Sequence, residues 1–282
     1  MFVMALKMYQ EKPSHPFEAI RNVVAVAAGK GGVGKSTVSV NLALALRQSG
    51  YRVGIMDTDV YGPSVRRMLP ENRMPAKRGE RIVPAHCSGI SMISMAYFRK
   101  DDEASVVRAP IANGVVKQFI QQVDWGELDY LIIDFPPGTG DIQLTLAQEG
   151  SLTGALMVTT PQEVAMMDVK KAMNMFDQVK VPVIGIVENM SYYLSGSEKV
   201  YLFGNGGGER LARERGLPFL GGIPILEDIS RCSDRGESIF SLESSEAAEA
   251  YLSLATGVDS HLKALTQSSQ DCLENFELIW KS

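Results

Sequence analysis

Residues 23–37 read VVAVAAGKGGVGKST, and this stretch decides the fold. The apolar run at 23–28 predicts a buried strand, and apolar positions at helical spacing after Lys35 predict a helix. Between them lies the pattern G-x-x-x-x-G-K-[ST], in the strand–loop–helix context that it requires. Glycines let backbone N–H groups turn inward, and the positive end of the following helix favours an anion. The stretch therefore predicts a loop that binds the phosphates of a nucleotide.

The residues of this loop have separate expected roles. Lys35 would reach the β- and γ-phosphates, the Ser36 hydroxyl would ligate Mg²⁺, and Thr37 would contact the α-phosphate. The residues that would surround the phosphates are Gly29, Lys30, Gly31, Gly32, Val33 and Gly34. Lys30 is a second lysine that phosphate binding does not require, and taken alone it is interpreted as solvated. The expected cofactors are ATP and Mg²⁺.

The pattern of a strand followed by a helix recurs along the chain. Further strands are expected at 52–56, 90–94, 130–133, 155–159, 183–187 and 219–223, and further helices at 111–122, 141–149, 163–178 and 243–258. Alternating strands and helices favour parallel pairing with right-handed crossovers. We therefore expect an α/β fold, a single domain with a mostly parallel sheet covered by helices on both faces. Segments 70–88 and 191–208 are interpreted as long loops.

Three aspartates follow predicted strands. Asp57 and Asp59 come at the end of the second strand, and Asp134 ends the run LIID at 131–134. The carboxyl ends of parallel strands form the edge at which open α/β sheets bind ligands. Asp134 is predicted to hold Mg²⁺ directly or through water, and the loop PPGTG at 136–140 to sense the γ-phosphate. Aspartates at strand ends also cap turns and helices, and this interpretation stays open for Asp57 and Asp59.

Composition narrows the class of protein. The net charge of −5 and the pI near 5.4 weigh against a general attraction to polyanions, so we expect neither nucleic acid nor membrane as a partner. Three widely spaced cysteines, Cys87, Cys232 and Cys272, form no disulfide pattern and favour a cytoplasmic setting. No apolar window is long enough to predict a membrane span. We divide the chain into a leader at 1–20, an ATPase domain at 21–258 and a C-terminal tail at 259–282.

Several motifs together resemble a known family. The string GKGGVGKST at 29–37 resembles the signature of the deviant Walker A ATPases, which include the MinD, ParA, nitrogenase iron-protein and Mrp/ApbC groups. The runs at 56–64, 124–148, 187–193 and 203–212 closely resemble the Mrp/ApbC iron–sulfur cluster carriers. The resemblance implies a slow ATPase that works as a homodimer in iron–sulfur cluster assembly or transfer. Its partners would be iron–sulfur client or scaffold proteins.

The resemblance also implies roles for individual residues. Lys30 would reach across the dimer interface and neutralise charge that develops on the partner's nucleotide during phosphoryl transfer. Asp59 would position or activate the attacking water, and Asp57 would support the metal environment. Asn189 would recognise adenine. The expected catalytic residues are thus Lys30, Lys35 and Asp59, and the expected metal site consists of Ser36, Asp57 and Asp134.

One loop departs from the family. The carriers typically place a Cys-x-x-Cys pair between the positions of Tyr193 and Phe203, and two pairs in a dimer supply four thiolates for a [4Fe–4S] cluster. Here residues 194–202 read LSGSEKVYL, without cysteine, so cluster binding in the usual manner is doubtful. Two alternatives stay open: a ParA- or MinD-like nucleotide-switched positioning protein, and a degenerate carrier acting as a chaperone or regulatory subunit beside a cysteine-bearing partner.

Overall fold

A computed structural model describes residues 17–60, 62–98, 109–196, 198–243 and 245–280, with the backbone alone for residue 109 and residues 269–280. Most of the expected leader, residues 1–16, therefore lies outside the described residues. The described chain begins at Phe17, whose ring packs in the hydrophobic core just before the first strand. The chain is thus anchored in the core from its first described residue.

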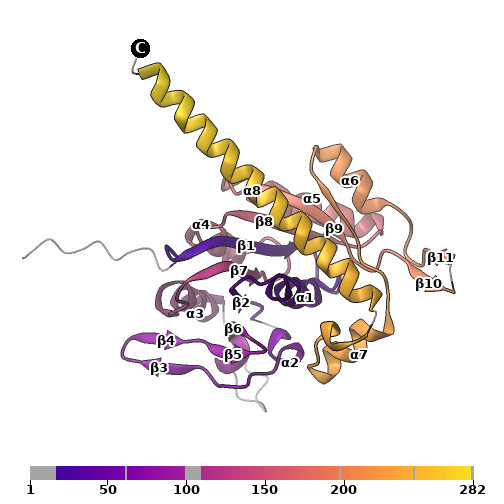
Figure 1. Ribbon diagram of the computed structural model, residues 1–282, viewed down its shortest axis with the longest axis horizontal. Coiled ribbons are helices and arrows are strands. Elements are labelled where there is room, and N and C mark those ends of the chain that lie inside the picture. Colours follow the sequence, from indigo (N-terminus) through magenta and orange to yellow (C-terminus); the bar gives the residue numbers. More distant parts are fainter. Residues whose placement is uncertain (1–16, 61, 99–108, 197, 244, 281–282) are drawn as a thin grey trace, which may run out of the picture.

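An eight-stranded sheet forms the centre of the fold, in the order β12-β9-β8-β1-β7-β2-β6-β5 (Figure 1). Its strands are β1 (Ile20–Ala28), β2 (Val53–Asp57), β5 (Ala85–Cys87), β6 (Ile90–Ser94), β7 (Leu128–Asp134), β8 (Gly154–Thr159), β9 (Val183–Glu188) and β12 (Phe219–Gly222). Neighbouring strands are parallel except β5, which pairs antiparallel with β6. The expected α/β fold with a mostly parallel sheet is confirmed.

Both faces of this sheet are buried under helices. Val24 and Val26 of β1 pack in the same cluster as α1 (Lys35–Gln48) and α8 (Glu246–Trp280). The alternate residues Val23 and Ala25 pack with α3 (Ala109–Gln122), α4 (Asp141–Glu149) and α5 (Glu163–Gln178) on the other face. Side chains of a strand alternate between faces, so burial of both faces explains why the strands read as continuous apolar runs.

The two segments expected to be loops contain short strands. Segment 70–88 holds a two-stranded hairpin, β3 (Ala76–Arg78) and β4 (Arg81–Val83), and then β5 of the main sheet. Segment 191–208 holds a second hairpin, β10 (Tyr193–Ser195) and β11 (Glu198–Val200), and the start of α6 (Gly207–Arg215). The loop interpretation was wrong here because strands of three residues are too short to show an alternating pattern.

The remaining short elements connect the sheet to its helices. They are α2 (Val65–Met68), α7 (Glu227–Arg235) and the 3₁₀ helices η1 (Met95–Phe98) and η2 (Ile239–Ser241). The helix α7 packs on α2 at a glycine: a Cβ on Gly236, which follows α7, would lie 2.7 Å from the ring of Pro70. The segment that carries Asp57 and Asp59 therefore leads through α2 to a contact with α7.

The last helix is longer than expected. The expectation that helix ends at residue 258 and a polar tail follows was wrong, because α8 runs without a break from Glu246 to Trp280. Gly257 is accommodated in the helix because its lack of a side chain lets Leu220 pack within 3.2 Å of the Cβ position. Lys263 then pairs with Asp259 one turn earlier, at 2.7 Å. Figure 1 shows the C-terminal part of α8 extending beyond the body.

None of the helices in the described part of the chain combines the length and the apolar character that a membrane crossing would need. The carboxyl ends of β1, β2 and β7 meet at one edge of the sheet, since these strands are parallel neighbours. The loop at 29–34, Asp57 and Asp134 all follow or end these strands. The fold therefore brings the expected site residues to one edge.

Candidate functional site

The loop between β1 and α1 approaches its neighbours so closely that two of its glycines have no room for a side chain. A Cβ on Gly29 would lie 2.0 Å from the backbone carbonyl carbon of Asp168 in α5. A Cβ on Gly34 would lie 2.2 Å from Nδ2 of Asn189. Gly34 also has a φ of 79°, a left-handed conformation that favours glycine. The loop is thus held from both sides, by α5 and by the end of β9.

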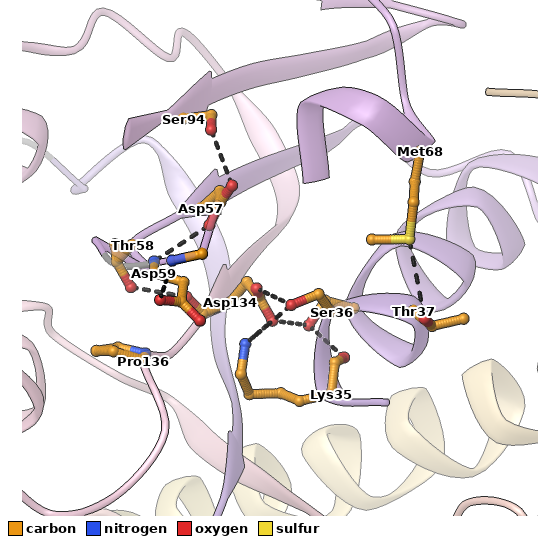
Figure 2. Close-up of polar contacts among 12 residues, drawn as sticks. Lys35, Ser36, Thr37, Asp57, Thr58, Asp59, Met68, Ser94, Asp134 and Pro136 are labelled. Atoms are coloured by element: carbon orange, nitrogen blue, oxygen red, sulfur yellow. Dashed lines mark hydrogen bonds and ion pairs between the residues drawn. The ribbon is translucent and has the colours of Figure 1, made fainter. Parts of the chain in front are cut away.

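The buried carboxylate of Asp134 is the centre of the site (Figure 2). Its Oδ1 lies 2.6 Å from Nζ of Lys35, which is only 7% exposed. The hydroxyl of Ser36 donates to Oδ2 at 2.7 Å, and the hydroxyl of Ser39 donates to Oδ1 at 2.6 Å. Three donors from the first two turns of α1 therefore converge on one carboxylate from β7, which joins the helix to the sheet.

Asp57 lies directly beside Asp134, because the two residues are register partners on β2 and β7. Its Oδ2 accepts a hydrogen bond from the Ser94 hydroxyl at 2.8 Å, and its Oδ1 accepts one from the backbone N–H of Asp59 at 3.1 Å. Burial, and then the negative charge of Asp134, raise the pKa of Asp57 to about 7. The ends of β2 and β7 thus hold two buried carboxylates, next to the buried ammonium group of Lys35.

The segment after β2 is folded back on the same edge. The backbone N–H and the hydroxyl of Thr58 both donate to the carbonyl oxygen of Asp134, at 3.1 and 2.7 Å. The half-buried Asp59 accepts a hydrogen bond on Oδ1 from the backbone N–H of Gly62 at 3.1 Å. Asp59 is therefore held in a turn at the open edge of the site, outside the buried group around Asp134.

Asn189 supports the loop from the end of β9. Its Nδ2 donates to the carbonyl oxygen of Val33 at 2.9 Å. The preceding residue, Glu188, is a buried carboxylate that accepts hydrogen bonds from the Ser191 hydroxyl and the Gly208 backbone N–H, both at 2.6 Å. Glu188 thereby ties the start of α6 to the turn that carries Asn189.

The outer side of the loop is open. Gly31 and Gly32 are exposed, and apart from the glycine and its two chain neighbours no described residue has an atom within 4 Å of a Cβ built on either position. Lys30 is half-buried and makes no side-chain hydrogen bond or ion pair within the described residues. The Thr37 side chain points away from Asp134, and its hydroxyl lies 3.8 Å from the sulfur of Met68 (Figure 2). Among the described residues Lys30 thus takes no part in the hydrogen bonds and the ion pair around Asp134.

A cavity of about 630 Å³ begins at the loop and is mostly apolar. At the loop it is lined by Gly34, Thr37 and Asn189. The other lining residues come from α2 and the residue before it, the turn after β9, the segment at 202–203, the turn at 224–226 and α7: Ser64, Arg67, Met68, Met190, Leu202, Phe203, Pro224, Ile225, Leu226, Ile229, Ser230, Ser233 and Asp234. Its size is that of a site for a small organic ligand.

The loop at 136–140 lies beside this edge and is tied to α4. Nε2 of Gln143 donates to the carbonyl oxygen of Pro137 at 2.6 Å. Gly138 has a φ of 94°, so the chain turns at a residue that tolerates the left-handed conformation. The segment predicted to sense the γ-phosphate is therefore attached to the first turns of α4 by a side-chain contact.

Sequence reasoning missed three residues of this site: Ser39, Ser94 and Glu188. Ser39 lies one helical turn after Lys35, so helical spacing alone could have placed both on the face toward the sheet. Ser94 ends β6 next to β2, and a polar residue at the end of an apolar strand was the available signal. Glu188 ends β9 in the same way and immediately precedes Asn189.

The donor set at this edge suits Mg²⁺, because a serine hydroxyl and carboxylate oxygens are the hard ligands that this ion prefers. For an iron–sulfur cluster, the loop at 194–202 contains no cysteine, and the described residues contain no group of three or more His, Cys, Asp or Glu side chains able to hold a metal. Cys87 and Cys232 are buried, and burial raises the pKa of both thiols, that of Cys87 to about 12. The side chain of Cys272 lies outside the described residues.

These features define a class. A glycine-rich loop between a strand and a helix, with its lysine and serine on a strand-end aspartate, is the arrangement of a P-loop nucleoside triphosphatase. The fold agrees: a nucleotide-binding protein of Archaeoglobus fulgidus, solved in complex with ADP, superposes with a TM-score of 0.68 at 39% identity, covering 78% of this chain and 88% of that one. The cell-division ATPase MinD of Pyrococcus furiosus superposes with a TM-score of 0.64 at 20% identity, covering 85% and 99%.

The chain belongs to the family described as ParA: NUBPL iron-transfer P-loop NTPase, which it matches over residues 19–259. An iron–sulfur cluster carrier protein of Aquifex aeolicus is 46% identical over 242 residues, which are 84% of this chain and 66% of the relative. The carrier of Escherichia coli strain K12 is 43% identical over 265 residues, 92% of this chain and 71% of the relative. This chain thus spans about two thirds of the length of these carriers. The resemblance noted in the sequence is confirmed.

Proposed function

We propose that this protein binds and hydrolyses ATP and acts in iron–sulfur cluster assembly or transfer. The observation that carries the proposal is the convergence of Lys35, Ser36 and Ser39 on Asp134, at the mouth of a cavity large enough for a nucleoside. Membership of an iron-transfer NTPase family supports the cellular role. The identity of more than 40% with carriers favours this role over a positioning function, since the likeness to MinD at 20% concerns the fold alone.

In this proposal the loop binds the polyphosphate and Lys35 changes partner. The ammonium group of Lys35 now neutralises Asp134, and it would turn toward the β- and γ-phosphates when they enter the loop. Ser36 and Asp134 would then hold Mg²⁺, with Asp57 behind them. The ion would screen negative charge on the phosphates. Asp59, held at the open edge by Gly62, would orient the water that attacks the γ-phosphorus.

The base would occupy the apolar cavity beside Asn189. The bond to Val33 uses one amide hydrogen of Asn189, which leaves the other hydrogen and the carbonyl oxygen for a base. An asparagine amide can pair with N6 and N7 of adenine through one donor and one acceptor, which supports ATP as the nucleotide. Asn189 therefore has two proposed roles, in shaping the loop and in recognising adenine.

The proposed assembly is a homodimer in the cytoplasm. Lys30 supports the dimer, because the two residues that follow it in the loop are exposed and Lys30 itself has no ion pair among the described residues. From there it would reach the nucleotide of a second subunit and stabilise charge during hydrolysis. The proposed division is an ATPase domain at 21–258 and a C-terminal segment at 259–282, although α8 continues across that boundary.

The nucleotide part is tested by calorimetric titration of the purified chain with Mg·ATP, Mg·ADP and Mg·GTP, together with phosphate release over time. We expect binding of both adenine nucleotides, weaker binding of Mg·GTP, slow release of phosphate, and loss of all of these in Lys35→Ala. Folded protein that gives neither heat nor a thermal shift with Mg·ATP would refute the proposal.

The iron–sulfur part is tested by anaerobic reconstitution with iron and sulfide, followed by iron analysis and the absorbance near 400 nm. Since the described residues offer no thiolate site, we expect a cluster to be retained only when a cysteine-bearing partner is present. Retention of about four irons per two chains by the isolated protein would contradict this expectation. A pull-down with this chain as bait that recovers no iron–sulfur protein, with or without ATP, would count against the cellular role.

A further inference from the structure

The segment Leu202–Phe203 forms one wall of the apolar cavity that begins at the phosphate-binding loop. Both side chains are unusually open for large apolar groups, at 58% exposure for Leu202 and 38% for Phe203. The same cavity is also lined by Gly34 and Thr37, beside which the phosphates of a bound nucleotide would begin. A base attached to those phosphates would therefore enter the cavity that this wall lines.

The hairpin β10–β11 connects this wall to the rest of the cavity. Before the hairpin, the Ser191 hydroxyl is fixed to Glu188, next to Asn189. At the start of the hairpin, the backbone N–H of Ile225 donates to the carbonyl oxygen of Tyr192 at 2.7 Å, and Ile225 also lines the cavity. After the hairpin the chain returns as 202–203. The segments before and after the hairpin, at 189–190 and 202–203, thus both line the cavity, although the hairpin itself projects from the body (Figure 1).

A base in this cavity would contact an aromatic ring and a branched aliphatic side chain that are now open to water. Removal of apolar surface from water is favourable, and a phenyl ring against a base adds stacking energy. Aliphatic side chains from the turn at 224–226 and from α7 line the cavity as well, so a base there would be enclosed by apolar groups.

We propose that Leu202 and Phe203 are nucleotide-retaining residues, which hold the base and thereby link nucleotide binding to the hairpin β10–β11. This inference rests on the proposed function and extends it to the loop in which the related carriers were expected to place a Cys-x-x-Cys pair. In this chain the loop carries no thiolate, and its end makes the wall of the base pocket.

The test compares Mg·ADP with inorganic tripolyphosphate, which occupies the phosphate loop but has no base. For Phe203→Ala and Leu202→Ala we expect the dissociation constant for Mg·ADP to rise about tenfold, as loss of base stacking predicts. The dissociation constant for tripolyphosphate should stay within about twofold of the wild-type value. Stopped-flow release of Mg·ADP should accelerate by the same factor, because loss of contacts in a complex mainly raises the dissociation rate.

The neighbouring Tyr201→Ala and Val200→Ala are the matched controls. These side chains lie in the same segment, are 43% and 39% exposed, and do not line the cavity. Both variants should bind Mg·ADP like the wild type. Equal effects of Phe203→Ala and Tyr201→Ala, or an equal weakening of tripolyphosphate, would overturn the inference. If Phe203→Ala does not fold, Phe203→Leu and Leu202→Ala decide the question. Wild-type protein that binds neither ligand would instead refute the proposed function.

Discussion

Replacement of Asp57 by asparagine should stabilise the nucleotide-free protein, and increasingly so as the pH rises. Asp57 is fully buried next to Asp134, and burial followed by that charge raises its pKa from 3.8 to about 7. Between these pH values the folded protein retains a proton that the unfolded chain releases, so the stability of the wild type falls as the pH rises. Asparagine keeps the shape of the side chain and removes the charge.

The size of the effect follows from the two pKa values. A rise from 3.8 to about 7 corresponds to ~4 kcal/mol of lost stability once the pH exceeds both values, at about 1.4 kcal/mol for each pH unit. About 2–3 kcal/mol of that loss develops between about pH 5 and about pH 8. For a domain of this size the gain in Tm of Asp57→Asn over the wild type should grow by about 5–10 °C across that range.

The assay is thermal unfolding of both proteins in the presence of a chelator, without nucleotide, at a series of pH values. Ser94→Ala is the control, and its expected effect on stability is the opposite one. The Ser94 hydroxyl donates a hydrogen bond to the ionised form of Asp57 and thereby lowers the pKa of that carboxyl. That variant should lose more stability at the alkaline end than at the acidic end. A Tm difference between Asp57→Asn and the wild type that stays constant with pH, or that becomes negative at about pH 8, would refute the reasoning.

Three further substitutions test other contacts of the site. Lys35→Ala removes the only basic group paired with buried Asp134 in the described chain, so the nucleotide-free protein should lose ~3–5 kcal/mol of unfolding free energy; unchanged stability in urea titration would contradict this. Lys30→Ala should leave the dissociation constant for Mg·ADP within about twofold while phosphate release slows by about a thousandfold, as for a charge-stabilising group supplied in trans; unimpaired turnover would exclude the cross-subunit role. Ser39→Ala removes a hydrogen bond of 2.6 Å to Asp134 and should lower the free energy of unfolding by ~1–3 kcal/mol, measured by the same urea titration. An unchanged free energy of unfolding would show that the Asp134 oxygen finds another donor.

The chemistry of the phosphate loop could be predicted because it is encoded locally. The pattern at 29–37 requires only a strand, a turn and a helix in sequence, and each leaves its own periodicity or composition. The aspartates were predicted for the same reason, since an acidic residue at the end of an apolar strand stands out. Their roles in catalysis and metal binding remain predictions.

The partners of those residues could not be predicted in the same way. Ser36 and Asp134 are 98 positions apart, and Ser94 reaches Asp57 from a different strand. Such contacts depend on the order of strands in the sheet, which places β2 and β7 side by side. Short elements were missed for a different reason: three-residue strands such as β10 and β11 form through pairing with each other, and their own residues show no period.

The sequence alone therefore determined the phosphate-binding loop, the alternating α/β class and the absence of thiolates between Tyr193 and Phe203. Only the tertiary structure decided that Ser39 joins Lys35 on Asp134, that α8 continues to Trp280, and that Leu202 and Phe203 face the cavity. The physical reason is one of range. The periodicity of helices and strands depends on residues that are close in the sequence. Burial, pKa shifts and cavities instead depend on residues far apart in the sequence, which come into contact only in the assembled sheet.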